Sequence, residues 1–190
     1  MGDLDRFLNP SGRISLRVLE QLAATHDRAS FGRILGRPVL AGSSVQAGAI
    51  TERQASSRQA VNQTFVFQIQ PPPDPLAEPE SVTDMLKHAI YPLVKSSDTG
   101  RASNIFTIGR VNQNDLIIPD LAISKRHAIL EIQAEGYFIR DSNSTNGTWL
   151  NGARLDEQRR AIRDGDSIAF ARYEFSFLLP DSLYQRLTGG

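Results

Sequence analysis

The sequence predicts an all-β fold, a two-sheet antiparallel β-sandwich of about ten to eleven short strands, preceded by a partly disordered N-terminal arm with a short amphipathic helix. Two observations lead to this prediction. After residue 88, short apolar runs alternate with turn residues about every eight to twelve positions, which is typical of a sandwich. No long helical pattern separates these runs, so consecutive strands are expected to be antiparallel.

The expected strands follow one another closely along the second half of the chain. Residues 127–133 (HAILEIQ) alternate apolar and polar side chains, as a strand with one buried face does. The turn 134–136 (AEG) separates this run from the next. Trp149 falls inside another run and is expected in the core. The runs expected to form strands are 89–94, 104–109, 116–118, 127–133, 137–141, 148–150, 167–171 and 173–179.

The first half of the chain has a different composition. Residues 41–64 are rich in Ala, Ser, Gln and Gly and offer little apolar surface to offset the entropy of ordering. Residues 71–79 read PPPDPLAEP, which is the composition of an extended linker. One amphipathic helix is expected before them, capped by Ser11, with apolar residues at every fourth position from Ile14 to Leu22.

These features divide the chain into four parts. They are an N-terminal arm at 1–70, a Pro-rich linker at 71–87, a sandwich domain at 88–182 and a short C-terminal helix or tail at 183–190. The arm is expected to be partly helical or disordered rather than an independent fold. The alternative is that its amphipathic helix docks into the groove of a partner.

The charge balance disfavours two classes of partner. Lys and Arg number 21, as do Asp and Glu, so the formal net charge is zero. A protein that grips a nucleic-acid backbone or an anionic membrane is normally basic, so neither partner is expected. The chain has no Cys and three distant His, so no metal centre and no cofactor is expected. No apolar run approaches the ~20 residues that span a bilayer, and the N-terminus does not resemble a secretory signal, so a cytoplasmic location is expected.

The loops between the expected strands carry four short motifs in a fixed order. They are Gly109-Arg110, Ser124-Lys125-Arg126-His127, the run 143–148 (NSTNGT) and Asn151-Gly152. Each is common alone, but four in order at strand ends form a specific signal. This segment resembles the forkhead-associated (FHA) domain family, whose pattern is GR, then SxxH, then an NG turn followed by a second NG. The resemblance extends over residues 88–180.

The resemblance implies that the loops of the sandwich bind phosphothreonine peptides. The residues implied in phosphopeptide binding are Arg110, Ser124, Lys125, Thr145 and Asn146, and those implied to support the site are Gly109, His127, Gly147, Asn151 and Gly152. The residue chemistry agrees, because a guanidinium fork, a hydroxyl and an ammonium all suit a phosphate dianion. Taken singly, each residue has a plainer role: an arginine at a strand end is usually a solvated charge, and Asn-Gly is a turn.

The function expected from these implications is phosphothreonine recognition by an intracellular signalling adaptor. Its expected partners are a phosphothreonine-containing protein and a Ser/Thr kinase. The alternative is an FHA-type scaffold or assembly subunit that does not read phosphate. Enzymatic activity is not expected: Ser124, His127 and Asp141 are the residue types of a hydrolase triad, but no G-x-S-x-G turn surrounds Ser124.

Two finer expectations concern the peptide and the arm. The family tends to take specificity from the residue three positions after the phosphothreonine, read by the loop before Ser124. That loop carries no charge at 121–123, so an apolar residue is expected there. A separate hypothesis is that a phosphorylated threonine of the first 87 residues occupies the chain's own binding face. The candidate threonines are Thr25, Thr51, Thr64 and Thr83.

Overall fold

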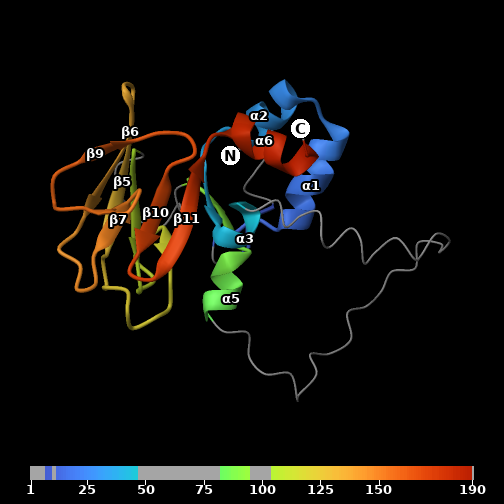
Figure 1. Cartoon of the computed structure of the whole chain (residues 1–190). Coiled ribbons are helices and arrows are strands. Elements are labelled where there is room, and N and C mark those ends of the chain that lie inside the picture. Colours follow the sequence, from blue (N-terminus) through green and yellow to red (C-terminus); the bar gives the residue numbers. More distant parts are fainter. Residues whose placement is uncertain (1–6, 10–11, 47–81, 95–103, 190) are drawn as a thin grey trace, which may run out of the picture.

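The computed structural model describes residues 7–9, 12–46, 82–94 and 104–189 and shows two packed sheets with helices beside them (Figure 1). Sheet A has six strands in the order β2-β1-β11-β10-β7-β8, and sheet B has five in the order β4-β3-β5-β6-β9. These eleven strands in two sheets confirm the predicted fold class.

The elements follow the chain in a simple order. The strands are β1 (Val39–Gly42), β2 (Ile90–Pro92), β3 (Ile105–Gly109), β4 (Leu116–Ile117), β5 (Ala128–Gln133), β6 (Gly136–Asp141), β7 (Thr148–Leu150), β8 (Ala153–Arg154), β9 (Arg160–Ile162), β10 (Ser167–Phe170) and β11 (Tyr173–Leu178). The helices are α1 (Leu16–Thr25), α2 (Arg28–Leu35), α3 (Ser43–Gln46), α5 (Val82–Lys87) and α6 (Pro180–Thr188). One pair departs from the expected antiparallel pattern. β3 and β4 are parallel, because the loop between them runs back along the strand edge before β4 begins.

The main core lies between the two sheets. Large side chains such as Ile108, Phe170 and Phe177 are fully buried there. Trp149 was expected in this core, and that expectation was wrong: the indole is half-buried. Its neighbour Thr148 is fully buried and occupies the core face of β7, so alternation along the strand turns Trp149 to the outer face. There the guanidinium of Arg154 lies 5.8 Å from the centre of the indole ring.

β1 is an interior strand of sheet A, although its residues fall within the predicted N-terminal arm. It lies between β2 and β11, and all four of its residues are buried. Leu40 faces the main core, whereas Val39 and Ala41 belong to a second core beneath the helices. A short apolar run covered on both faces carries no alternation that marks it as a strand.

The second core joins the described part of the arm to the sandwich. Helices α1, α2 and α6 pack together beside sheet A (Figure 1) and bury Leu19, Phe31 and Leu183. The Phe31 and Tyr184 rings are 5.4 Å apart. α1 begins later than expected, at Leu16, because the backbone of Ile14 pairs instead with Ile90 of β2. The proposed cap Ser11 and the Pro-rich segment 71–79 lie outside the described residues.

Replacement of Leu40 by alanine tests the place of β1 in the fold. Leu40 is fully buried between β2 and β11, so Leu40→Ala should lower the free energy of unfolding by about 2–5 kcal/mol. Leu121→Ala is the matched control, since the Leu121 side chain is 86% exposed and should change stability little. Urea denaturation of the full chain measures both. Equal stabilities for the two variants would contradict the assignment of β1 to the core.

Candidate functional site at the loop end of the sandwich

Three loops meet at one end of the sandwich. They follow β3, precede β5 and join β6 to β7. The Arg110 backbone N–H donates to the Ser124 carbonyl at 3.0 Å, and the Thr145 N–H donates to Ser124 Oγ at 3.0 Å. The structure therefore brings together Arg110, Ser124 and Thr145, which the sequence motifs placed up to 35 positions apart.

Gly109 lets the first two loops approach each other. A Cβ atom at this position would collide with the Lys125 carbonyl oxygen and with the Asn114 amide. That amide also links the two loops, because Asn114 Nδ2 donates to the Val111 carbonyl at 2.8 Å and to the Lys125 carbonyl at 2.7 Å. The glycine of the GR motif is thus required by the close contact between the β3–β4 loop and the Ser124 loop.

His127 connects the Ser124 loop to the β6–β7 loop from the buried side. The side chain is fully buried, Nδ1 accepts the Ser124 N–H at 3.2 Å, and Nε2 lies 2.9 Å from the Gly147 carbonyl. These partners require a neutral ring with its hydrogen on Nε2. Burial lowers the pKa of His127 below its ordinary value, against the opposing effects of the Gly147 carbonyl and the Asp141 carboxylate.

Asp141 organises the β6–β7 loop. Its Oδ1 accepts hydrogen bonds from the hydroxyls of Ser144 and Thr148, both at 2.6 Å, and its Oδ2 accepts the Ser144 N–H at 2.8 Å. Burial by itself would raise the pKa of Asp141, but these hydrogen bonds outweigh burial and hold the pKa below its usual value. The Ser144 hydroxyl in turn accepts the Gly147 N–H at 2.9 Å, where the backbone turns with a φ of +83°.

The remaining predicted binding residues line the rim of this loop end. The Arg110 Nε is buried and finds no hydrogen-bond partner among the described residues. Lys125, Thr145 and Asn146 are exposed. One hydrogen of the Asn146 amide bonds to the Ala122 carbonyl at 2.8 Å, which leaves a second donor and the amide oxygen available.

The structure separates one predicted support pair from the rest. Asn151 and Gly152 lie at the far end of β7 from Gly147. There Asn151 donates to Asp166 at 2.9 Å and accepts the Ser167 N–H at 2.9 Å. The pair therefore stabilises the turn between β7 and β8 and the start of β10, not the three loops directly.

Several residues that hold the loops in place were not predicted from the sequence. Asn114, Ser144 and Thr148 were not singled out, and Asp141 was considered only as a triad member. A signal was present, because an Asp at a strand end followed by Ser three positions later is a typical Asx-turn pattern. The Ser124, His127 and Asp141 side chains do not form a triad: His127 binds the Ser124 backbone, and Asp141 binds Ser144 and Thr148.

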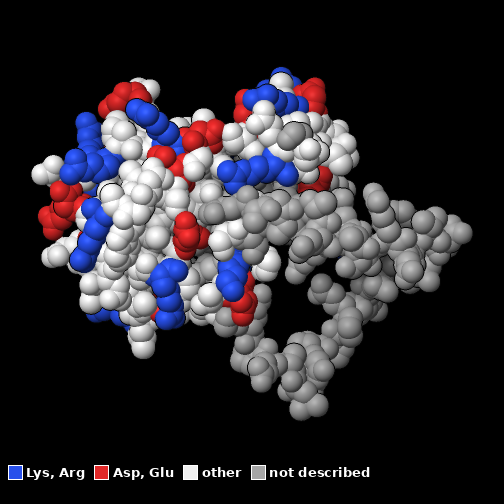
Figure 2. All heavy atoms as spheres, viewed as in Figure 1, with Lys and Arg blue, Asp and Glu red and all other residues white. Residues whose placement is uncertain are grey.

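Some expectations concern features beyond these loops. Within the described ranges, no three His, Asp or Glu side chains gather as a metal site would require. No helix in the same part of the chain is long and apolar enough to cross a membrane. Thr25 ends α1 and Thr83 lies in α5, whereas Thr51 and Thr64 lie outside the described residues. On the face shown in Figure 2, cationic and anionic side chains are interspersed.

The chain thus forms a β-sandwich in which three hydrogen-bonded loops place polar side chains at one end. Residues 106–171 match the family described as FHA domain. The chain therefore carries a domain of the forkhead-associated family, as the motifs predicted.

Several known proteins are similar to part of this chain. The ABC transporter ATP-binding/permease protein Rv1747 of Mycobacterium tuberculosis is 41% identical over 70 residues, which are 37% of this chain and 8% of that protein. Transcriptional regulatory protein EmbR of Mycobacterium bovis is 31% identical over 70 residues, 37% of this chain and 18% of that protein. A solved structure of M. tuberculosis EmbR with a low-affinity phosphopeptide has a TM-score of 0.39 and 27% identity, covering 45% of this chain and 24% of that one. The matches thus span no more than about a quarter of the length of these relatives.

Acidification tests the role assigned to His127. Because burial lowers its folded-state pKa, the unfolded chain binds more protons as the pH falls below about 6.5, and the free energy of unfolding should decrease. Between pH 7 and pH 5, His127→Gln should show a smaller decrease than the wild type. Exposed His88→Gln is the control and should keep the wild-type slope.

An NMR titration gives an independent measurement for the case in which His127→Gln does not fold. In the wild-type chain the His127 ring should titrate with a pKa below 6.5. A measured value above 6.5 would contradict the neutral, buried ring described above.

Proposed function

We propose that this chain binds phosphothreonine peptides through the loop end of its FHA domain and acts as an intracellular signalling adaptor downstream of a Ser/Thr protein kinase. FHA domains are among the modules that read phosphorylated motifs with arginine side chains. The partner is a phosphothreonine-containing protein. The proposed binding residues are Arg110, Ser124, Lys125, Thr145 and Asn146.

One observation carries the proposal. Arg110 and Ser124 lie on loops that are hydrogen-bonded to each other, and the Arg110 Nε is a buried donor with no partner in the described part of the chain. An unsatisfied buried donor is costly, and more so when it is charged, so a phosphate that accepts from it gains affinity.

The hydroxyl of Ser124 is prepared for the same anion. Its oxygen accepts the Thr145 N–H at 3.0 Å, and its hydrogen donates to the Thr145 hydroxyl over a long 3.5 Å, a weak contact that a phosphate oxygen can replace. Lys125 adds an exposed ammonium next to it. Charge-assisted contacts contribute about 1.5–3 kcal/mol each, and after ordering costs the expected affinity is near micromolar, about −8 kcal/mol.

Removal of the arginine tests phosphate recognition. A phosphothreonine peptide and its unphosphorylated twin are compared by fluorescence anisotropy with the full chain. Arg110→Ala should weaken binding of the phosphorylated peptide about ten- to hundredfold. Arg163→Ala is the matched control, because this arginine is exposed on the turn before β10, at the opposite end of the sandwich. Equal wild-type affinity for the two peptides would instead favour the scaffold that does not read phosphate.

The loop before Ser124 supports an apolar preference three positions after the phosphothreonine. Leu121 is 86% exposed there, whereas Ile123 is buried and cannot contact a peptide. The neighbouring acid Asp120 accepts the Ala122 N–H and pairs with Arg172 at 2.7 Å. A peptide side chain at this place would therefore meet an apolar surface beside a carboxylate.

A peptide pair tests this preference. A phosphothreonine peptide with Leu three positions after the phosphothreonine should bind about three- to tenfold more tightly than the same peptide with Asp there. The gain comes from the partial burial of the peptide Leu and of Leu121 against each other. Leu121→Ser should remove most of the difference. A clear preference for Asp in the wild type would show that another group reads this position.

A further inference from the structure

The loop end contains a hollow that the proposed binding residues mostly do not line. It is open to solvent, has a volume of about 490 Å³, and lies between the β3–β4 loop, the segment 125–126 and Ser142. Its lining residues are Val111, Gln113, Asn114, Lys125, Arg126 and Ser142. Arg110, Ser124 and Thr145 are not among them. The hollow thus lies next to the proposed phosphothreonine-binding residues and shares only Lys125 with them.

Two exposed cations line this hollow without an acidic partner. Neither Lys125 nor Arg126 makes an ion pair with any residue that the structure describes. Three other arginines of the domain are paired with carboxylates, namely Arg140, Arg160 and Arg172. Two more lie over aromatic rings, Arg154 over Trp149 and Arg159 over Phe138. Lys125 and Arg126 therefore place two adjacent positive charges, without an acidic partner among the described residues, on this hollow.

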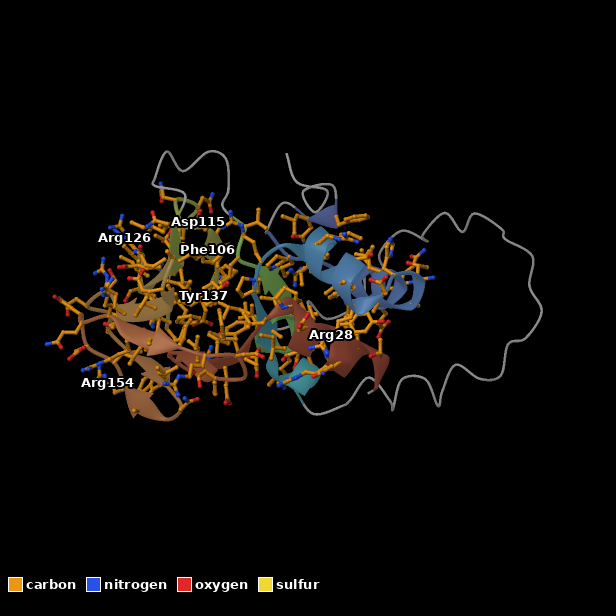
Figure 3. The ribbon with its side chains drawn as sticks, turned by 90° about the horizontal axis from the view of Figure 1, so that it is seen from above. Arg28, Phe106, Asp115, Arg126, Tyr137 and Arg154 are labelled. Carbon is orange, nitrogen blue, oxygen red and sulfur yellow. The ribbon has the colours of Figure 1, made fainter. Side chains whose placement is uncertain are left out.

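Arg126 lies at the outer edge of the sandwich, on the same side as Asp115 (Figure 3). The Asp115 carboxylate is buried and accepts hydrogen bonds from the Thr107 N–H and hydroxyl at 2.8 and 2.9 Å, and Asp115 is not among the residues that line the hollow. Adjacent like charges repel each other, and an anion placed between them relieves that repulsion.

The walls of the hollow are fixed and mostly polar. The Asn114 amide holds the Val111 and Lys125 carbonyls at 2.8 and 2.7 Å, so the two loops keep their separation without a ligand. The exposed Gln113 amide can donate to a bound oxygen, and so can the half-buried Ser142 hydroxyl. A preformed site with two cations and further donors suits a carboxylate or a phosphate group.

We propose that this hollow binds a second anionic side chain of the same phosphothreonine peptide, either an acidic residue or a second phosphorylated residue. The inference rests on the proposed function. Lys125 directly follows Ser124, and consecutive Cα atoms are about 3.8 Å apart, so a peptide residue a few positions from the phosphothreonine reaches the hollow. The preferred partner is then a phosphothreonine motif with a flanking negative charge, in addition to an apolar third following residue.

A series of peptides in which one Glu is moved along the sequence tests the proposal. The probes are a neutral phosphothreonine peptide and variants with one Glu at each position from four before to four after the phosphothreonine. A doubly phosphorylated peptide is made at the register that responds most. Anisotropy titrations of the full chain at low salt should show one register that binds about three- to tenfold more tightly than the neutral peptide, because exposed charge pairs are weak and screened. The second phosphate should increase the gain.

Arg126→Ala should abolish this gain while leaving the affinity for the neutral phosphopeptide unchanged, and Arg163→Ala should preserve both. If the neutral phosphopeptide binds but no Glu register tightens binding, or if the gain persists in Arg126→Ala, the hollow is not a subsite. If the wild-type chain does not distinguish the neutral phosphopeptide from its unphosphorylated twin, the proposed function itself is wrong and the inference falls with it.

Discussion

The arrangement of the loop end depends on the burial of one neutral imidazole. His127 accepts from the Ser124 backbone with one ring nitrogen and binds the Gly147 carbonyl with the other, so two loops from different strands are held at a fixed separation. Its ring packs edge-on against Phe170, with centroids 6.0 Å apart, which ties both loops to the main core. An apolar side chain in this place would leave both partners without a hydrogen bond.

Around this imidazole, the loops are held by side chains bonded to backbone. Asp141 accepts three hydrogen bonds within its own loop, and Asn114 bonds to carbonyls of two loops. The loop end is therefore organised before any partner arrives, which reduces the ordering cost of binding. Two donors at this loop end have no hydrogen-bond partner among the described residues. They are the buried Arg110 Nε and the second hydrogen of the exposed Asn146 amide.

Sheet A connects this end to the rest of the chain, because it is covered on both faces. β1 places Leu40 in the core between the sheets and Val39 and Ala41 in the core under α1, α2 and α6. The described part of the N-terminal segment therefore contributes a central strand to the FHA sandwich. Truncations designed from the loop motifs alone would remove that strand.

By itself, the sequence determined the two-sheet class, most strand positions and the four loop motifs, because strand alternation and turn residues are local signals. Its motifs pointed to Arg110 and Ser124, which the structure places on neighbouring loops, but not to Asn114 or Ser144, whose polar side chains look like ordinary turn residues until their partners are known. Only the tertiary structure decided that Val39–Gly42 joins β11, that Trp149 faces outward and that Asn151 lies away from the loop end. Each of these outcomes depends on contacts between residues far apart in the chain, which no local pattern encodes.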